Sequence, residues 1–324
     1  MTAQGRIASL STPVWELAAL AAAVESGLVA ALDEPREVGE LAERAGLPVA
    51  VATALLDVLA AMDLAERDGD RWVAGAQLEP ATRGPRLGAM RDDLRTTLLQ
   101  AHALFATARS DPQALGGWRH TDEDLLQAQG RLSASVIPML AQVLFPHVPG
   151  LLGRLESGSG AFLDVGAGVA AVSIAMCRQY PAIRAVGLEP ASVPLALARR
   201  NVVDAGMEHR IELRDRRVEE LDDDAAFDVA WLPASFLSAD TFSVALDTVH
   251  RALRPGGLLL TGALDPRGAD GEGAVARLRL ILWGGESLTP DEVAAMIAAA
   301  GYVGVTAVPR QSGRLVPIHA RRPG

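Results

Sequence analysis

The sequence predicts an α/β protein in two parts: a mainly helical N-terminal part, followed by a doubly wound parallel sheet. In the first half, apolar residues recur at helical spacing. In the second half, short apolar runs alternate with helical patterns. The chain has 324 residues, 49% of them hydrophobic, which is enough for two domains with buried cores. We place these domains at residues 1–110 and 111–324.

In the first half, helical patterns cover residues 12–32, 37–46 and 48–64, and a hairpin is expected over 65–73 because Asp68-Gly69 is a tight-turn pair. Helix, turn, helix and hairpin together outline a winged helix. Further helices are expected over 94–109 and 121–144. The segment around residues 13–33 is apolar, but Glu16 and Glu25 interrupt it. We expect a mostly buried helix of a cytoplasmic protein there rather than a membrane span.

In the second half, five strand-like runs are separated by helical patterns. Strands are expected over 161–166, 184–189, 210–215, 227–232 and 257–264, and helices over 169–180, 192–205, 240–253 and 290–300. Strands and helices that alternate at this spacing favour a parallel sheet covered by helices on both faces.

Composition excludes several classes of function. The formal net charge of −10 disfavours binding to nucleic acids or to anionic membranes. All 30 basic residues are arginine, so the chain has no lysine for a Schiff base or for a Lys-containing phosphate loop. Cys177 is the only cysteine, which excludes an intrachain disulfide and a cysteine-cluster zinc site. No metal site is predicted.

A glycine-rich turn follows the first strand of the second half. Gly166, Gly168 and Ala171 fit the spacing of dinucleotide-binding turns, and Asp164 precedes them. A dinucleotide would bring a pyrophosphate close to Asp164, whereas S-adenosylmethionine would bring an ammonium and a sulfonium. A charge pair about 4 Å apart is worth about 4 kcal/mol at an effective dielectric of about 20, so Asp164 favours the cationic ligand. The alternative is a carboxylate that caps the next helix.

Two further acids end the next two strands. Glu189 can accept hydrogen bonds from both ribose hydroxyls, which suits either ligand, and Asp215 can accept one from the amino group of adenine. Either acid alone could be a solvated strand end. Acids at three successive strand ends are a more specific pattern, because open α/β sheets bind ligands at that edge.

These motifs resemble the class I S-adenosylmethionine-dependent methyltransferases. "LDVGAG", "GLEP", "RDRRVEEL" and "ALRPGG" correspond to successive motifs of that family, and "LWGGESLTPDEVAAMIAAAGY" resembles the C-terminal segment of its small-molecule O-methyltransferases of the caffeate and hydroxyindole type. The resemblance implies a Rossmann-like domain behind a winged-helix-like dimerisation domain, and an intertwined homodimer. It implies S-adenosylmethionine as cofactor, bound by Asp164, Gly166, Gly168, Glu189, Asp215, Arg216 and Trp231.

The catalytic base of that family cannot be carried over. The family places a histidine and an acid shortly after the fourth strand, but near Ser235 to Ser238 this chain has no histidine. His120 is the candidate substitute, although a loop or helix-capping role is the alternative. A base matters most for a hydroxyl acceptor, so its absence shifts weight towards N- or C-methylation. The resemblance implies an acceptor pocket lined by Trp118, Gln129, Ser133 and Trp283, which also suit ordinary core packing.

The sequence therefore predicts a methyltransferase that acts on a small, aromatic specialised metabolite at an N, C or O atom. One alternative is a donor-binding homologue with another outcome, such as cyclisation. A nucleotide-dependent oxidoreductase is disfavoured by Asp164 and Asp215. A winged-helix regulator that senses a small molecule is disfavoured because residues 1–92 carry 8 Arg against 14 Asp and Glu.

Overall fold

The computed structural model describes residues 2–308 and 315–324. Contacts divide the chain into two compact units, Met1–Ala103 and Leu104–Gly324. The division falls inside the long helix α6 (Gly84–Ser110). The boundary predicted after residue 110 lies at the end of that helix and stays a prediction.

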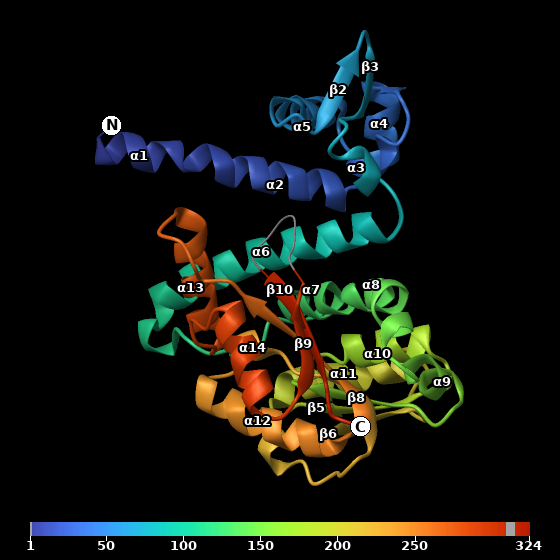
Figure 1. The fold of residues 1–324 in the computed structure, drawn as a ribbon. Coiled ribbons are helices and arrows are strands. Elements are labelled where there is room, and N and C mark those ends of the chain that lie inside the picture. Colours follow the sequence, from blue (N-terminus) through green and yellow to red (C-terminus); the bar gives the residue numbers. More distant parts are fainter. Residues whose placement is uncertain (1, 309–314) are drawn as a thin grey trace. The chain divides into compact units, whose positions relative to one another are not determined.

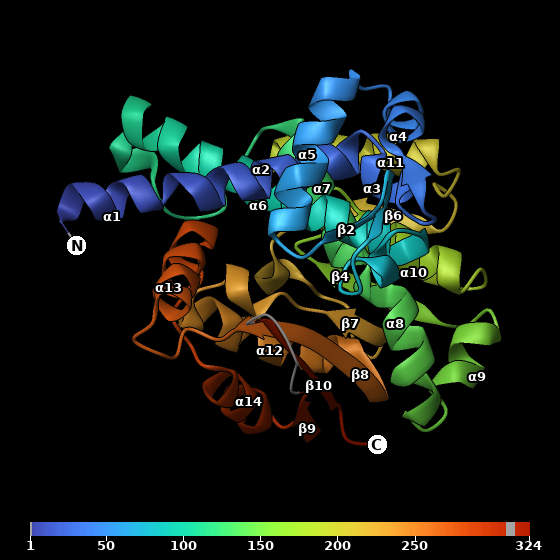
Figure 2. The ribbon, with the colours of Figure 1, turned by 90° about the horizontal axis from the view of Figure 1, so that it is seen from above.

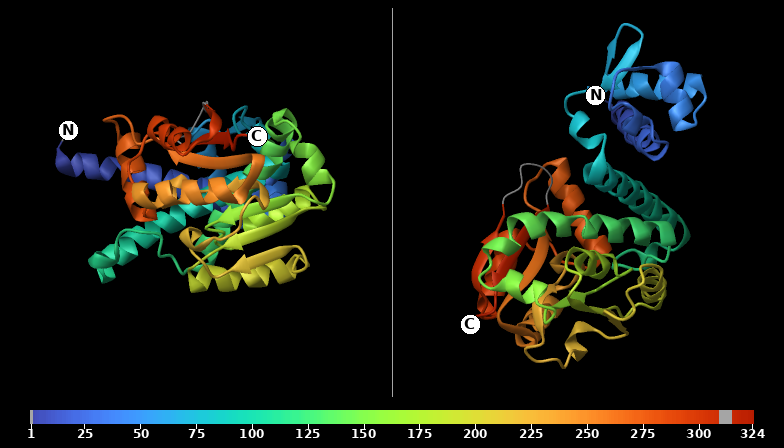
Figure 3. Two further views of the ribbon diagram at one scale, coloured as in Figure 1. Left: turned by 60° about the horizontal axis from the view of Figure 1, so that its bottom comes forward. Right: turned by 90° about the vertical axis from the view of Figure 1, so that its right-hand side faces the viewer.

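The first unit consists of helices and a small sheet. Its other helices are α1 (Ala3–Ser9), α2 (Ser11–Glu25), α3 (Leu28–Ala31), α4 (Val38–Ala45), α5 (Val49–Ala61) and the short η1 (Glu79–Ala81), and its strands are β1 (Arg36–Glu37), β2 (Ala65–Asp68) and β3 (Arg71–Ala74). The sheet order is β1-β3-β2. Asp68 pairs with Arg71 across the turn, and Gly69 has a φ of 60°, so the predicted hairpin is present (blue in Figure 3).

The N-terminal helix differs from its prediction in two ways. Gly27 adopts a φ of 83° and separates α2 from α3, which breaks the helix expected over 12–32. Moreover, Gln4–Glu25 is mostly exposed within the chain, whereas residues 21–32 are mostly buried, so the prediction of a mostly buried helix holds only for the second half of the predicted range. Only 17% of its most apolar window is buried, and by length and composition alone this helix could span a membrane. Its exposed apolar residues are Ile7, Leu10, Val14 and Trp15.

The second unit is built on a seven-stranded sheet, of which the sequence predicts five strands (Figure 1). The strands are β4 (Ala161–Val165), β5 (Arg184–Leu188), β6 (Ile211–Arg214), β7 (Phe227–Trp231), β8 (Leu253–Leu264), β9 (Val303–Ala307) and β10 (Leu315–Arg321), in the order β6-β5-β4-β7-β8-β10-β9. The first five strands of this order are mutually parallel. Strand β10 runs antiparallel to both β8 and β9, a pairing that was not predicted.

Helices cover both faces of this sheet (Figure 2). One face packs on α8 (Val136–Val143), α9 (Leu151–Glu156), α10 (Ala171–Gln179) and α11 (Ser192–Asp204), and the other on α12 (Ala239–Ala252) and α14 (Pro290–Ala299). Each face has its own buried cluster, centred on Phe162 and on Phe242 respectively. The strands are therefore sequestered on both sides, and ligands can reach the sheet only at its edges and strand ends.

The remaining elements lie around the carboxyl ends of the strands or in connections. They are α7 (Glu123–Ala134), α13 (Gly271–Trp283) and the short turns η2 (Pro112–Ala114), η3 (Phe145–His147), η4 (Val218–Glu220) and η5 (Ala234–Phe236). The single helix predicted over 121–144 is two helices, because the chain breaks at Ser135 between α7 and α8. Helix α13 was not predicted.

Candidate functional site

The glycine-rich turn connects β4 to α10 through backbone that side chains rarely adopt. Gly166, Gly168 and Ala170 have φ values of 65°, 56° and 61°. Positive φ at an L-residue other than glycine is strained, so Ala170 occupies a position that glycine would fill more easily. Ala171, which fits the third position of the sequence pattern, is the first helical residue of α10, and a Cβ on Gly130 would lie 3.2 Å from its Cβ.

Helix α7 holds this turn in place. The side chains of Gln127 and Asn201 bond to each other, and Asn201 Nδ2 also donates to the carbonyl of Val169 at 2.9 Å. Gly130 allows α7 to come close: a Cβ there would lie 2.4 Å from Cγ2 of Val169. The turn is therefore fixed by packing as well as by its own glycines.

The three predicted acids gather at one edge of the sheet. Strand register places Asp164 beside Gly187 on β5, and Leu188 beside Arg214 on β6. Glu189 and Asp215 each follow directly after these strands. Their charges act on one another: Glu189 contributes to a raised pKa at Asp164, and Asp215 to a raised pKa at Glu189. The structure thus brings together the carboxylates that the sequence placed at successive strand ends.

Glu189 links the glycine-rich turn to β5. Its two carboxylate oxygens accept hydrogen bonds from the backbone N–H groups of Gly168 and Ala191, both at 2.8 Å. Burial raises the pKa of Glu189, and the two N–H donors act in the opposite direction. Each carboxylate oxygen can accept a second bond, so Glu189 keeps the capacity to bind a ribose diol.

Asp164 is almost completely buried and serves the fold directly. Its Oδ2 accepts from the N–H of Ser173 at 3.1 Å and from the Ser173 hydroxyl at 2.6 Å. This carboxylate therefore holds the first turn of α10, as the capping alternative proposed. Burial raises its pKa to about 7. Its Oδ1 has no hydrogen-bond partner in the described ranges 2–308 and 315–324.

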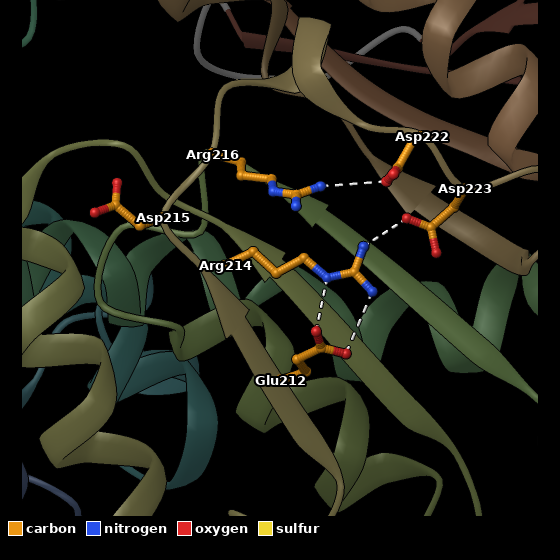
Figure 4. A pocket seen from close by; sticks show the side chains of 6 residues that line it. All are labelled: Glu212, Arg214, Asp215, Arg216, Asp222 and Asp223. Carbon is orange, nitrogen blue, oxygen red and sulfur yellow. Dashed lines mark hydrogen bonds and ion pairs between the residues drawn. The ribbon is translucent and has the colours of Figure 1, made fainter.

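A cavity of about 590 Å³ opens beyond β6, next to Asp215 (Figure 4). Its lining residues are all charged: Glu212, Arg214, Asp215, Arg216, Asp222 and Asp223. Ion pairs join Arg214 to Glu212 and Asp223, while Arg216 pairs with Asp222 at 3.2 Å. The excess of carboxylates disfavours a phosphate here.

An aromatic cluster lies on the other side of the turn. Trp118 meets His120 edge-on at a centroid distance of 4.6 Å and meets Phe236 edge-on at 5.1 Å, while Phe236 stacks on Trp283 at 5.1 Å. Trp118 also packs against the buried group that contains Val169. Three of the predicted residues therefore meet in one cluster. Phe236 was missed, because a lone aromatic after a strand has no distinguishing pattern.

The other predicted pocket residues lie elsewhere. Gln129 and Ser133 bond to each other at 3.3 Å on α7. Trp231 is level with Asp164 across the β4–β7 pair, but it packs on the sheet face covered by α8 to α11. Within the described residues, no ring contact joins Trp231 to the aromatic cluster, so its role beside a cofactor stays a prediction.

The serine hydroxyls near the position where a catalytic base is expected form hydrogen bonds that stabilise the fold. The hydroxyl of Ser235 donates to the carbonyl of Gly262 at 3.3 Å and accepts from the N–H of Leu264 at 3.1 Å. Ser238 caps α12. His120 is half-buried, and burial lowers its pKa, so its imidazole is neutral near pH 7 and able to accept a proton.

Comparison with known proteins identifies the domain that carries these acids. Residues 162–257 match the family model described as "Methyltransferase domain". Residues 162–257 therefore form a methyltransferase domain. The match runs from β4 into β8, so it includes the glycine-rich turn and all three acids.

Relatives of this methyltransferase domain agree with that assignment. A release factor glutamine methyltransferase from Cereibacter sphaeroides is 29% identical over 187 residues, which is 55% of this chain and 66%, just under two thirds, of that relative. Among solved structures, the apo S-adenosylmethionine-dependent methyltransferase SibL aligns at 20% identity with a TM-score of 0.67, covering 98% of this chain and 99% of that one.

The fold likeness extends through both units. Mitomycin 7-O-methyltransferase MmcR aligns at 22% identity with a TM-score of 0.61, over 99% of this chain and 98% of its own. Human N-acetylserotonin methyltransferase aligns at 16% identity with a TM-score of 0.58, over 100% of this chain and 99% of its own. At these identities, the likeness establishes the fold and no more.

The residues at the strand ends of the methyltransferase domain fit its cofactor. Glu189 can accept further hydrogen bonds from the ribose hydroxyls, and Oδ1 of Asp164 can accept one from an ammonium. Asp215 can accept one from an amino group on a purine. Among the described residues, no group of three or more His, Cys, Asp or Glu side chains could hold a metal ion.

Gly130→Ala tests whether α7 fixes the turn. The added methyl would overlap the stiff Val169 side chain, so we expect destabilisation of about 1–3 kcal/mol, the usual cost of overpacking, together with weaker cofactor binding. Urea unfolding and calorimetric titration measure the two effects. Gly153→Ala in α9 is the matched control, because a Cβ there meets nothing within 4 Å. Equal behaviour of the two variants would contradict this role of Gly130.

Asp164→Asn tests the burial of that carboxyl. Between its ordinary pKa of 3.8 and its folded pKa of about 7, the folded chain holds a proton that the unfolded chain releases. The contribution of Asp164 to stability therefore falls as pH rises through this window, by about 2–4 kcal/mol. Asparagine keeps an oxygen for Ser173 and carries no charge, so the variant should lose less stability than the parent between pH 5 and 8.

Urea unfolding at both pH values checks this expectation, with Asp222→Asn as the exposed control. If the free energy of unfolding changes by the same amount in the parent and in Asp164→Asn between pH 5 and 8, this carboxyl is not the titrating group.

Proposed function

We propose that this protein transfers the methyl group of S-adenosylmethionine to a small aromatic metabolite. The observation that carries the proposal is the position of Trp118, which packs both against the aromatic cluster and against the buried group containing Val169 of the glycine-rich turn. An acceptor that lies on Trp118 would therefore be next to the donor, and Trp283, which is buried in contact with Phe236 and with the guanidinium of Arg279, supports this wall from within the cluster. Flat aromatic walls favour flat acceptors.

Within this function, the strand-end acids bind and orient the donor. Glu189 would accept from the ribose hydroxyls while its N–H partners keep it in place, and Asp164 would meet the ammonium through Oδ1. Asp215 would serve the amino group of the base. Bound S-adenosylmethionine supplies a methyl group already activated by its sulfonium. Alignment of the acceptor can then supply much of the rate.

The kind of atom that is methylated depends on whether a side chain can remove its proton. Ser235 and Ser238 are engaged in structural bonds, which leaves His120 as the basic side chain of the aromatic cluster. Its edge contact with Trp118 limits its reach, and Asp122 is close enough to act on its charge. We favour an amine or an aromatic carbon, which can react first and lose its proton afterwards. With His120 as base, a hydroxyl acceptor is the second choice.

Two further properties belong to this proposal. We infer a homodimer, because exposed apolar residues on α1 and α2, including Trp15 at 73% exposure, would be covered by a second copy. We infer a cytoplasmic enzyme of specialised metabolism whose first unit is a winged-helix-like dimerisation module. A donor-binding homologue with another outcome, such as cyclisation, is the alternative that the acceptor experiment separates.

The donor and acceptor classes can be tested together. We expect S-adenosylhomocysteine to bind the whole chain with a Kd in the micromolar range, about −8 kcal/mol, and NAD to bind far more weakly. Glu189→Ala should weaken binding by about 1–3 kcal/mol, the cost of losing a charged partner. Incubation with methyl-labelled donor and a panel of aromatic amines, indoles and phenols should label a product. Tight NAD binding, or label in no class of acceptor, would contradict the proposal.

The same assay with His120→Ala distinguishes the acceptor atoms. If His120 is a general base, kcat should fall by about 10²–10⁴-fold with unchanged donor affinity. For an amine or carbon acceptor we expect a loss below about tenfold, mostly in KM. A large kcat defect with normal acceptor binding would restore O-methylation as the first choice.

Trp15→Glu tests the dimer. Light scattering should give about twice the chain mass of 33.9 kDa for the parent. Placing a charge on the exposed apolar face should raise the dimer dissociation constant at least about tenfold, which corresponds to about 1.4 kcal/mol. Gln4→Glu makes the same change of charge at an exposed polar position on α1 and should leave the mass unchanged. A parent protein that is monomeric at micromolar concentration would exclude this inference.

A further inference from the structure

Another cavity, of about 460 Å³, lies at the opposite end of α10 from the glycine-rich turn. Its lining comes from α8, α9 and the end of α10, which lie side by side in Figures 1 and 2. Helix α10 leads from the carboxyl end of β4 towards the amino end of β5, about 13 Å away at the usual helical rise. The cavity is therefore separate from the strand-end acids, and its volume lies within the usual range of small-molecule sites.

Tyr180 brings a polar group with no partner to this cavity. The residue is only 7% exposed, and its ring packs against that of Phe145 at a centroid distance of 6.0 Å. Its hydroxyl has no hydrogen-bond partner among the described residues, yet it is not one of their fully buried unpaired atoms, so it is accessible from the cavity that Tyr180 lines. Polar groups of buried side chains are normally hydrogen-bonded, so a hydroxyl that opens on a cavity in this way indicates a partner inside the cavity, either a ligand or water.

The charge beside this hydroxyl is negative. Burial raises the pKa of Tyr180, and the charge of Glu156, the last residue of α9, raises it further, while no arginine of the described residues acts in the opposite direction. Glu156 is exposed and forms no ion pair within residues 2–308 and 315–324. Arg154 is paired with Asp228 and Arg210 bonds to backbone carbonyls, and neither arginine lines the cavity. A carboxylate without a counter-charge favours a cation over an anion.

The remaining walls suit a ligand with one charged end and an apolar body. Gln179, the last residue of α10, adds an amide oxygen that can accept a hydrogen bond. Leu155 is fully buried and Leu152 is half-buried, so both provide apolar surface. We propose that this cavity binds a small primary amine. Its ammonium, which carries three N–H donors at pH 7, donates to Glu156 and to the Tyr180 hydroxyl, and its hydrocarbon body lies on the two leucines.

Tyrosine NMR of the whole chain tests this site, because the sequence contains only two tyrosines. With isotope-labelled tyrosine, phenethylamine at pH 7 should shift the Tyr180 signal, which is assigned by its loss in Tyr180→Phe. The shift should saturate with a Kd of about 0.1–1 mM, as expected for a ligand of this size. Tyr302 is buried on the other face of the sheet, where its hydroxyl donates to the carbonyl of Leu246. Its signal is the internal control and should not move.

A variant and a matched anion test the chemistry of the ligand. Glu156→Gln keeps the size of the side chain and removes its charge, so the Kd of phenethylamine should rise at least about tenfold. Glu208→Gln makes the same change at an exposed glutamate outside the lining and should bind like the parent. Phenylpropanoate, an anion of similar shape, should leave the Tyr180 signal in place.

Three results would overturn the proposal: equal shifts of Tyr180 with the amine and the anion, the same amine affinity in the parent and Glu156→Gln, or a Tyr180 signal that neither ligand moves. The last result would mean that the cavity holds only water. An amine that binds at the aromatic cluster instead would also leave Tyr180 unmoved, so the two positions are distinguished.

Discussion

The Glu189 carboxylate, with its hydrogen bonds from Gly168 and Ala191, is the interaction on which the site depends. A carboxylate that follows a buried strand must be neutralised or bonded, since an isolated buried charge is costly. Here, the donors are backbone N–H groups of the glycine-rich turn and of the chain after β5. The same contact thus satisfies the acid, fixes the turn and leaves oxygen capacity facing the ligand side.

Crowding of carboxylates explains why the site suits a cation. Burial raises the pKa values of Asp164 and Glu189, and the charge of a neighbouring carboxylate adds to each shift, which means that the ionised forms of these two acids are disfavoured in the chain by itself. A ligand that brings positive charge relieves this repulsion, whereas a pyrophosphate increases it. The absence of lysine has the same consequence, because no ammonium of the chain can pair with these acids. The positive charge of the donor therefore balances the negative charge of these acids.

The acceptor side is organised by packing instead of charge. Residues 118–120, the turn after β7 and the end of α13 are distant in sequence, yet their aromatic rings form one connected cluster. Close backbone approach makes this possible: a Cβ on Gly285 would lie 2.3 Å from the carbonyl of Ser235. The N–H of Gly117 also donates to the carbonyl of Ile281. The shape of this wall thus depends on Gly117 and Gly285, where the backbone comes close to another segment.

The sequence by itself determined the order of elements and the acids of the cofactor side. Strand periodicity, turn glycines and carboxylates at strand ends are local features, and parallel strands must bring their carboxyl ends to one edge. This is why the sequence alone predicts Asp164, Glu189 and Asp215 at neighbouring strand ends. The hairpin at Asp68-Gly69 was predictable for the same reason, because two adjacent residues specify it.

Only the tertiary structure decided the rest. The antiparallel pairing of β10 with β8 and β9 depends on contacts between segments far apart in the chain. The positive φ of Ala170 is held by its surroundings and not by the preference of alanine, so no spacing in the sequence indicates it. Phe236 joins Trp118 and Trp283 because three loops converge, and Trp231 faces another layer because strand alternation directs it there. Local pattern specifies which groups end each strand, and long-range packing decides which side chains meet.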